Sequence, residues 1–106
     1  ADAYAACIVR KGCHSVIALP GGHSVRNSSG CPALATAGSG DCLTGMIAAA
    51  LAGDSAGELL PAVAEAVFLH GLAGELAADI HGMRGVIADD LPELIPAARR
   101  SITPFA

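Results

Sequence analysis

The sequence predicts an α/β domain in which short strands come first and three helices follow. The first third of the chain contains short apolar runs with β-branched residues, separated by turn-forming Gly and Pro. The remaining two thirds place apolar residues at helical spacing. A length of 106 residues fits one domain.

Three strands are expected in the first part of the chain, at residues 6–9, 15–19 and 23–26. The turn signal Pro20-Gly21-Gly22 separates the second strand from the third. Because this connection is short, the third strand is expected to return antiparallel to the second.

The first two helices are expected at 39–53 and 58–80. Ser39 is the expected N-cap of the first, and Gly53 is a C-terminal stop signal. Gly45 lies inside this helix, where glycine costs about 1 kcal/mol relative to alanine. It therefore suggests the close approach of another element. Residues 58–80 are apolar on nearly every side, which is typical of a buried helix.

The third helix is expected to start at Asp90, which fits an N-cap. Pro92 suits the first turn, and Glu93 stands at the capping-box spacing. Its apolar stripe comprises Leu91, Leu94, Ile95 and Ala98.

Composition excludes several classes of protein. With 53% hydrophobic and 15% charged residues, the chain is too apolar to be disordered. Its net charge of −4 and the lack of a basic stripe argue against nucleic-acid binding. The charge-free stretch 42–53 is much shorter than the roughly 20 residues of a membrane span, so no membrane partner is expected. Asp2 stands where a signal peptide would be basic.

The four cysteines, Cys7, Cys13, Cys31 and Cys42, form no CxxC pair and show no zinc-site spacing. We expect buried, reduced thiols, in keeping with a cytoplasmic protein.

The strongest local motif is Gly38-Ser39-Gly40-Asp41, at the start of the first helix. Glycines allow close backbone approach, and the free N–H groups of a first helical turn suit a phosphate. Asp41 adds negative charge there, which makes sense if its carboxylate accepts the proton of an attacking hydroxyl. The alternative is that the serine and aspartate only cap a helix, and short glycine motifs often mislead in this way.

A second candidate is Lys11, the only lysine, which follows the first strand and could reach a phosphate. Taken alone, it is more simply explained as a solvated turn residue. Among the histidines, His70 is expected to be a core imidazole with a hydrogen-bond partner. His23 and His81 are expected at turns or on the surface, and His14 is not expected to bind metal with its neighbour Cys13.

Four segments together resemble the ADP/ATP-dependent NAD(P)H-hydrate dehydratases of the ribokinase-like superfamily. Residues 11–17 (KGCHSVI) are similar to the family's KGxxT-V-I segment, and 27–43 to its N-x-x-G-N-P-x-x-A-T-G-G-T-G-D-V-L-x-G stretch. Residues 70–74 (HGLAG) resemble its HGxAG helix, and 87–91 (IADDL) its IAxDL segment.

The resemblance implies roles for individual residues. Asp41 would contact the substrate and act as the catalytic base. Gly38, Ser39 and Gly40 would form an anion hole. The implied nucleotide-binding residues are Lys11, Gly12, Cys13, His14, Ser15 and Gly40.

The implied reaction is the dehydration of the hydrates NADHX and NADPHX to NADH and NADPH. ADP or ATP would be the phosphoryl donor with Mg²⁺, and ADP would leave as AMP and phosphate. An NAD(P)H-hydrate epimerase would be the functional partner. Two alternatives stay open: a ribokinase-like kinase acting on a thiazole or pyrimidine alcohol, and a non-catalytic module.

The chain departs from the family pattern at Ser15, Cys31, Ala37 and Ser39, where Thr, Asn, Gly and Thr are usual. Residues 1–106 resemble only the C-terminal part of the family's three-layer αβα domain, without its N-terminal strands or any epimerase domain. We therefore expect the isolated chain to lack activity. We also expect it to associate with the missing part or with further copies of itself, because its sheet would keep an unpaired edge.

Overall fold

The computed structural model describes residues 1–12, 14–53 and 58–102. Strands come first and helices follow, as predicted. In chain order the elements are η1 (Asp2–Tyr4), β1 (Ile8–Arg10), β2 (Val16–Ala18), β3 (Ser24–Arg26), η2 (Pro32–Leu34), α1 (Ser39–Gly53), α2 (Leu59–His81) and α3 (Asp90–Ile102).

The three strands form an antiparallel sheet in the order β1-β2-β3. Ile17 is the central residue and pairs with Val9 on one side and Val25 on the other. The predicted pairing direction is confirmed, although β2 and β3 are shorter than expected and β1 ends one residue later. The Asp2 carboxylate accepts a hydrogen bond of 2.7 Å from the Gly21 N–H, which ties η1 to the turn between β2 and β3.

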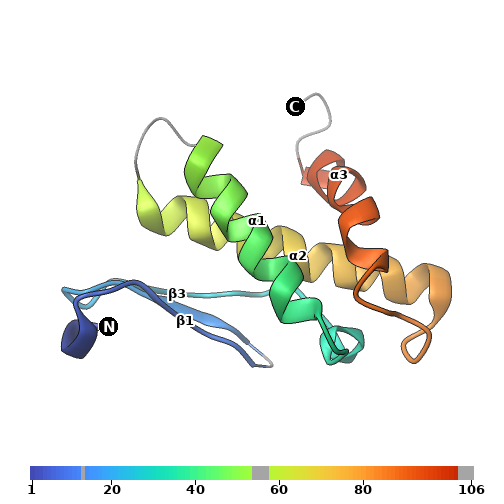
Figure 1. Cartoon of the computed structure of the whole chain (residues 1–106), viewed down its shortest axis with the longest axis horizontal. Helices are drawn as coiled ribbons and strands as arrows, with labels where there is room; N and C mark the ends of the chain where they lie inside the picture. The colour runs from blue at the N-terminus through green and yellow to red at the C-terminus, as the bar shows by residue number, and fades with distance from the viewer. Residues whose placement is uncertain (13, 54–57, 103–106) are drawn as a thin grey trace.

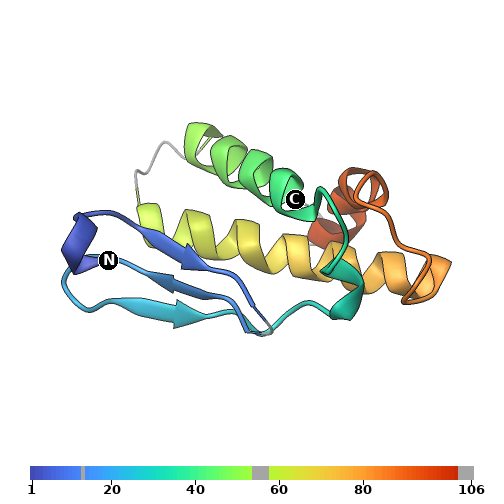
Figure 2. The same ribbon diagram turned by 60° about the horizontal axis from the view of Figure 1, so that its bottom comes forward.

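Helices cover one face of this sheet (Figures 1 and 2). Ile17 is fully buried and packs with Leu43 of α1 and with Val63 and Val67 of α2. Successive strand residues point to opposite faces, so the outer residue Ile8 is exposed. The described residues thus supply the sheet and one helical layer.

α2 is the central helix of the domain. A second core cluster joins Ala73 and Ala77 of α2 to Ala33, Val86 and Leu91. The expected all-round burial is therefore confirmed over the middle of the helix.

By length and composition, α2 is also apolar enough to cross a membrane, although only half of its most apolar stretch is buried. The expectation based on residues 42–53 overlooked this helix, because its few charged residues interrupt an otherwise apolar run. A core helix satisfies the same criterion.

α3 begins at Asp90, as expected, but Asp90 is the first residue of the helix and not its N-cap. Its Oδ2 atom accepts a hydrogen bond of 2.8 Å from the Ile87 N–H, three residues earlier. The carboxylate therefore closes the turn that leads into the helix. Leu91 and Ala98 of the predicted stripe are fully buried.

The cysteines Cys7, Cys31 and Cys42 are free thiols and half-buried, whereas Cys13 lies outside the described residues. Burial raises the pKa of the Cys42 thiol, which favours the neutral form.

Candidate functional site: an amide and lysine cradle at the start of α1

The structure brings together Lys11 and Gly40, which are far apart in sequence. β1 ends at Arg10, so the following lysine leaves the sheet beside the first turn of α1. Its Nζ atom lies 2.5 Å from the point where a Cβ atom would stand on Gly40. The missing side chain of the glycine therefore leaves room for an ammonium group over the helix start.

The first turn of α1 presents free backbone N–H groups. The Gly38 carbonyl accepts a hydrogen bond of 3.2 Å from the Cys42 N–H, and the Ser39 N–H donates to the Thr36 carbonyl at 3.2 Å. The amides of Gly40 and Asp41 lie between these bonds, in the turn whose N–H groups have no intrahelical acceptor. With Lys11 beside them, they form a cradle suited to an anion.

The expectation that Ser39 is the N-cap is wrong, since Gly38 supplies the first helical carbonyl acceptor. Gly38 has a φ of +91°, a backbone conformation that residues other than glycine rarely adopt. The Ser39 hydroxyl instead points back and donates a hydrogen bond of 2.8 Å to the Leu34 carbonyl. This serine therefore anchors the turn to η2.

His70 of α2 holds the same turn from the other side. Its side chain is buried, and its Nε2 atom lies 3.0 Å from the Ser39 carbonyl oxygen. A carbonyl only accepts, so the ring donates Nε2–H. Burial lowers the pKa of His70 from 6.5, the hydrogen bond to Ser39 opposes this, and the positive charge of Lys11 lowers it further. The expected core imidazole is confirmed, but the sequence did not reveal its partner.

Two glycines of α2 let the segment before α1 pack closely. A Cβ on Gly71 would overlap the side chain of Ser29, and a Cβ on Gly74 would lie 2.6 Å from the Leu34 side chain. Ser29 also donates a hydrogen bond of 2.8 Å to the Phe68 carbonyl. The HGLAG segment is therefore a docking surface for the segment that leads into α1.

For the other predicted site residues that it describes, the structure shows no contact with the cradle. Gly12 and His14 are exposed in the connection between β1 and β2, and Cys13 is outside the described residues. Ser15 is half-buried, and its carbonyl accepts a hydrogen bond of 2.8 Å from the Asn27 N–H. The side chain of Asp41 is exposed.

The close approach predicted at Gly45 is wrong. This glycine is exposed, and a Cβ there would meet no atom of the described structure within 4 Å. Among the described residues, no group of three or more His, Cys, Asp or Glu side chains is arranged to hold a metal ion.

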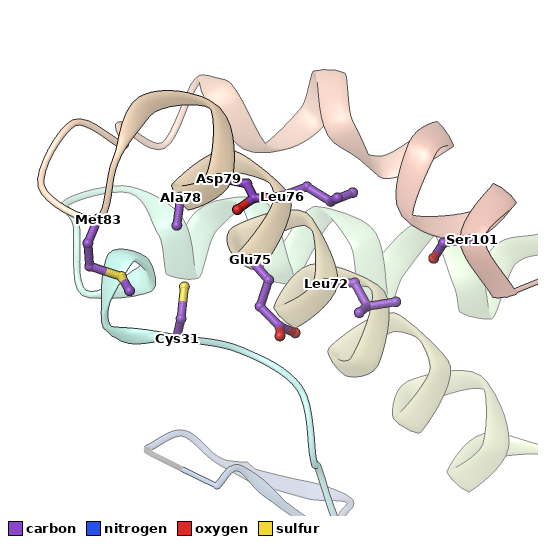
Figure 3. Close-up of a pocket in the computed structure, with 8 residues that line it drawn as sticks. All are labelled: Cys31, Leu72, Glu75, Leu76, Ala78, Asp79, Met83 and Ser101. Atoms are coloured by element: carbon purple, nitrogen blue, oxygen red, sulfur yellow. The ribbon is translucent and has the colours of Figure 1, made fainter.

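A separate open groove of about 550 Å³ runs along α2, and no sequence pattern predicted it. Figure 3 shows Cys31 and Met83 at one end and Ser101 of α3 further along. The acidic residues Glu75 and Asp79 also line it. The Glu75 carboxylate accepts a hydrogen bond of 3.2 Å from the Gly30 N–H, so it already serves the packing of that loop.

Comparison with known proteins identifies the family. The NAD(P)H-hydrate dehydratase family model matches residues 1–97. A bifunctional NAD(P)H-hydrate repair enzyme from Thermofilum pendens is 47% identical over 97 residues, which are 92% of this chain and 18% of that protein. An ADP-dependent (S)-NAD(P)H-hydrate dehydratase from Bacillus subtilis is 42% identical over 89 residues, which are 84% of this chain and 32% of that enzyme.

A solved structure gives the same result for the fold. The ADP/ATP-dependent NAD(P)H-hydrate dehydratase from Bacillus subtilis, co-crystallised with ATP and Mg²⁺, superposes with a TM-score of 0.85 and 36% identity. The match covers 94% of this chain and 38% of the enzyme. The chain thus spans between about a fifth and two fifths of the length of these relatives, and its strands and helices form part of a ribokinase-like fold. It belongs to the NAD(P)H-hydrate dehydratase family.

Proposed function

We propose that this chain supplies the phosphate-binding and proton-accepting part of a nucleotide-dependent NAD(P)H-hydrate dehydratase. The observation that carries the proposal is the placement of Lys11 over Gly40, at the free amides of α1. It joins the two segments, 11–17 and 27–43, for which the family resemblance implies nucleotide binding. Membership of the family supports the choice of substrate.

The cradle fits the phosphates of ADP or ATP. A lysine ammonium supplies a point charge, and the amides of Gly40 and Asp41 supply directed donors. Hydrogen bonds to a charged acceptor contribute roughly 1.5–3 kcal/mol each. A side chain at position 40 would occupy the space that the lysine ammonium now takes, so glycine there lets the ammonium lie over the helix start.

Asp41 is the proposed catalytic base. Its exposed carboxylate stands in the same helical turn as the phosphate donors. Hydroxide is a poor leaving group, so the ring hydroxyl of the hydrate must first be phosphorylated. In the proposed reaction, Asp41 accepts the hydroxyl proton as the oxygen attacks the terminal phosphorus. Phosphate then leaves with the C–O electron pair, and loss of a ring proton restores NADH or NADPH.

The Gly38 and Gly40 amides would stabilise the charge that develops on the transferred phosphoryl group. Ser39, whose N–H and hydroxyl already donate to the Thr36 and Leu34 carbonyls, would hold the turn between them. Loss of one such donor costs about 2.7–4 kcal/mol in other enzymes. Mg²⁺ bound to the nucleotide would neutralise part of the phosphate charge. We propose that Gly12, Cys13, His14 and Ser15 also contribute to nucleotide binding, because the family resemblance of the segment that begins at Lys11 implies it.

The partners of the complete reaction are proposed on the same basis. Bifunctional relatives are named as repair enzymes, which supports an NAD(P)H-hydrate epimerase as the functional partner. We further propose a cytoplasmic location, and association of an outer strand of the sheet, β1 or β3, with the rest of a dehydratase domain or with a second copy.

The test follows NADHX consumption by the full-length protein with ADP and with ATP, for the wild type and Asp41→Asn. The proposal expects turnover in the wild type and a loss of about a thousandfold in the variant, with nucleotide affinity retained. Full activity of Asp41→Asn would remove this residue from the mechanism. A wild type that phosphorylates thiazole or pyrimidine alcohols, but leaves NADHX unchanged, would establish the kinase alternative instead.

A further inference from the structure

The first turn of α1 is held by a closed circuit of contacts that begins and ends on α2. The Leu34 side chain packs on Gly74, and the Leu34 carbonyl accepts the hydroxyl hydrogen bond of Ser39. The Ser39 carbonyl in turn accepts Nε2–H from His70. His70 and Gly74 lie one turn apart on α2, so the circuit has little freedom to move.

The peptide between Ser39 and Gly40 is the link in this circuit that faces the cradle. In a trans peptide, the carbonyl and the next N–H point in opposite directions. When His70 fixes the Ser39 carbonyl toward α2, the Gly40 N–H is directed away from α2, toward the open start of α1. Ser39 belongs to α1, so the helix already orients this peptide, and the buried histidine adds a second restraint on the direction of a donor that it does not touch.

We infer that His70 is a positioning residue that aligns the Gly40 amide for phosphate binding. The inference rests on the proposed function for the identity of the anion. The geometry itself rests on the 3.0 Å contact, the burial of the ring and the second anchor through Ser39. His70 itself does not contact the nucleotide in this proposal.

The neutral state of the ring suits this role. Burial lowers its pKa, and the nearby Lys11 charge acts in the same direction. A neutral Nε2–H tautomer donates to Ser39 without placing a buried positive charge near the exposed lysine. The lysine can then direct its charge to the anion.

Three variants of the full-length protein separate positioning from mere packing. His70→Gln keeps a donor near the Nε2 position, His70→Asn places its amide nearer the Nδ1 position, and His70→Leu has no donor. We expect His70→Gln to bind ADP and ATP with Mg²⁺ within about threefold of the wild type. His70→Asn and His70→Leu should each lose about tenfold in affinity, which is the effect of one misaligned hydrogen bond.

The amide signals of Gly40 and Asp41 in NMR spectra of the ligand-free protein give a readout that does not depend on the nucleotide. They should shift in His70→Asn and His70→Leu and stay near their wild-type positions in His70→Gln. Equal losses in all three variants, or wild-type affinity and unshifted amides in a folded His70→Leu protein, would overturn the inference.

If His70→Asn and His70→Leu do not fold, the ring of the wild type decides the question. Nitrogen shifts that show a protonated Nε2, hydrogen-bonded and protected from exchange, support the role, whereas an unprotonated Nε2 refutes it. A wild type that binds neither ADP nor ATP would refute the proposed function, and unshifted Gly40 and Asp41 amides in the variants would refute the positioning of the peptide.

Discussion

The Nζ atom of Lys11 occupies space that a side chain on Gly40 would need, at 2.5 Å from the ideal Cβ position. Gly40→Ala should therefore displace the ammonium while leaving the helix intact, because the end of a lysine side chain moves easily. We expect ADP affinity to fall about tenfold, from the loss of one charge-assisted contact. Calorimetric titration with ADP and Mg²⁺ measures this change.

Gly45→Ala is the matched control for that variant. It lies in the same helix, and a Cβ there meets no described atom within 4 Å. This substitution should raise the free energy of unfolding by about 0.5–1 kcal/mol, because alanine is the better helix former. ADP affinity should not change. A loss of affinity in both variants would show that helix stiffness, and not the lysine contact, determines binding.

Removal of the Lys11 charge should change the titration of His70. The lysine is one cause of the lowered pKa of the histidine, so Lys11→Met should raise that pKa toward 6.5. Burial remains in the variant, and the pKa should therefore stay below the ordinary value. NMR titration of the His70 ring signals follows the change. An unchanged pKa would mean that the ammonium does not act on this ring in solution.

Gly71→Ala should destabilise the fold, because its Cβ would overlap Ser29, whose backbone carbonyl carbon lies only 2.8 Å away. Overpacking of this kind costs about 1–3 kcal/mol. Denaturant unfolding of Gly71→Ala beside Gly45→Ala measures the difference in the free energy of unfolding. Equal stability of the two variants would contradict the close packing of Ser29 on α2.

Stability should decrease on mild acidification because of His70. The folded state lowers the pKa of this ring, so the unfolded chain takes up its proton first as the pH falls below 6.5. The contribution of His70 is complete above that pH and decreases down to the lowered pKa of the folded state. Denaturant unfolding at several values between pH 8 and pH 5 (about three units around the ordinary histidine value) gives the free energy of unfolding at each pH. This free energy should change less with pH in His70→Gln than in the wild type.

Much of the fold was predictable because its signals are local. Glycine and proline turns mark the ends of the strands, and the apolar surface of α2 indicates its burial. The motif around Gly40 likewise marked the helix start, because free first-turn amides are a property of any helix.

The errors concern contacts between different elements of the structure. Ser39 has the side chain of an N-cap, but the Leu34 carbonyl competes for its hydroxyl. Gly45 and Gly71 are both glycines inside helices, but of the two only Gly71 packs against the backbone of another segment. No local pattern could assign His70 to the Ser39 carbonyl, since that pairing depends on how α2 crosses the start of α1.

The sequential order of the sheet bears on how this region assembles. β1, β2 and β3 pair only with their neighbours along the chain, through short connections. Closing such connections costs little entropy, so these hairpins can form before α2 is complete. The Lys11 ammonium would then already lie at the end of the formed β1–β2 hairpin. The cradle would be completed only when α2 packs against the start of α1, so phosphate binding would report a late step of folding.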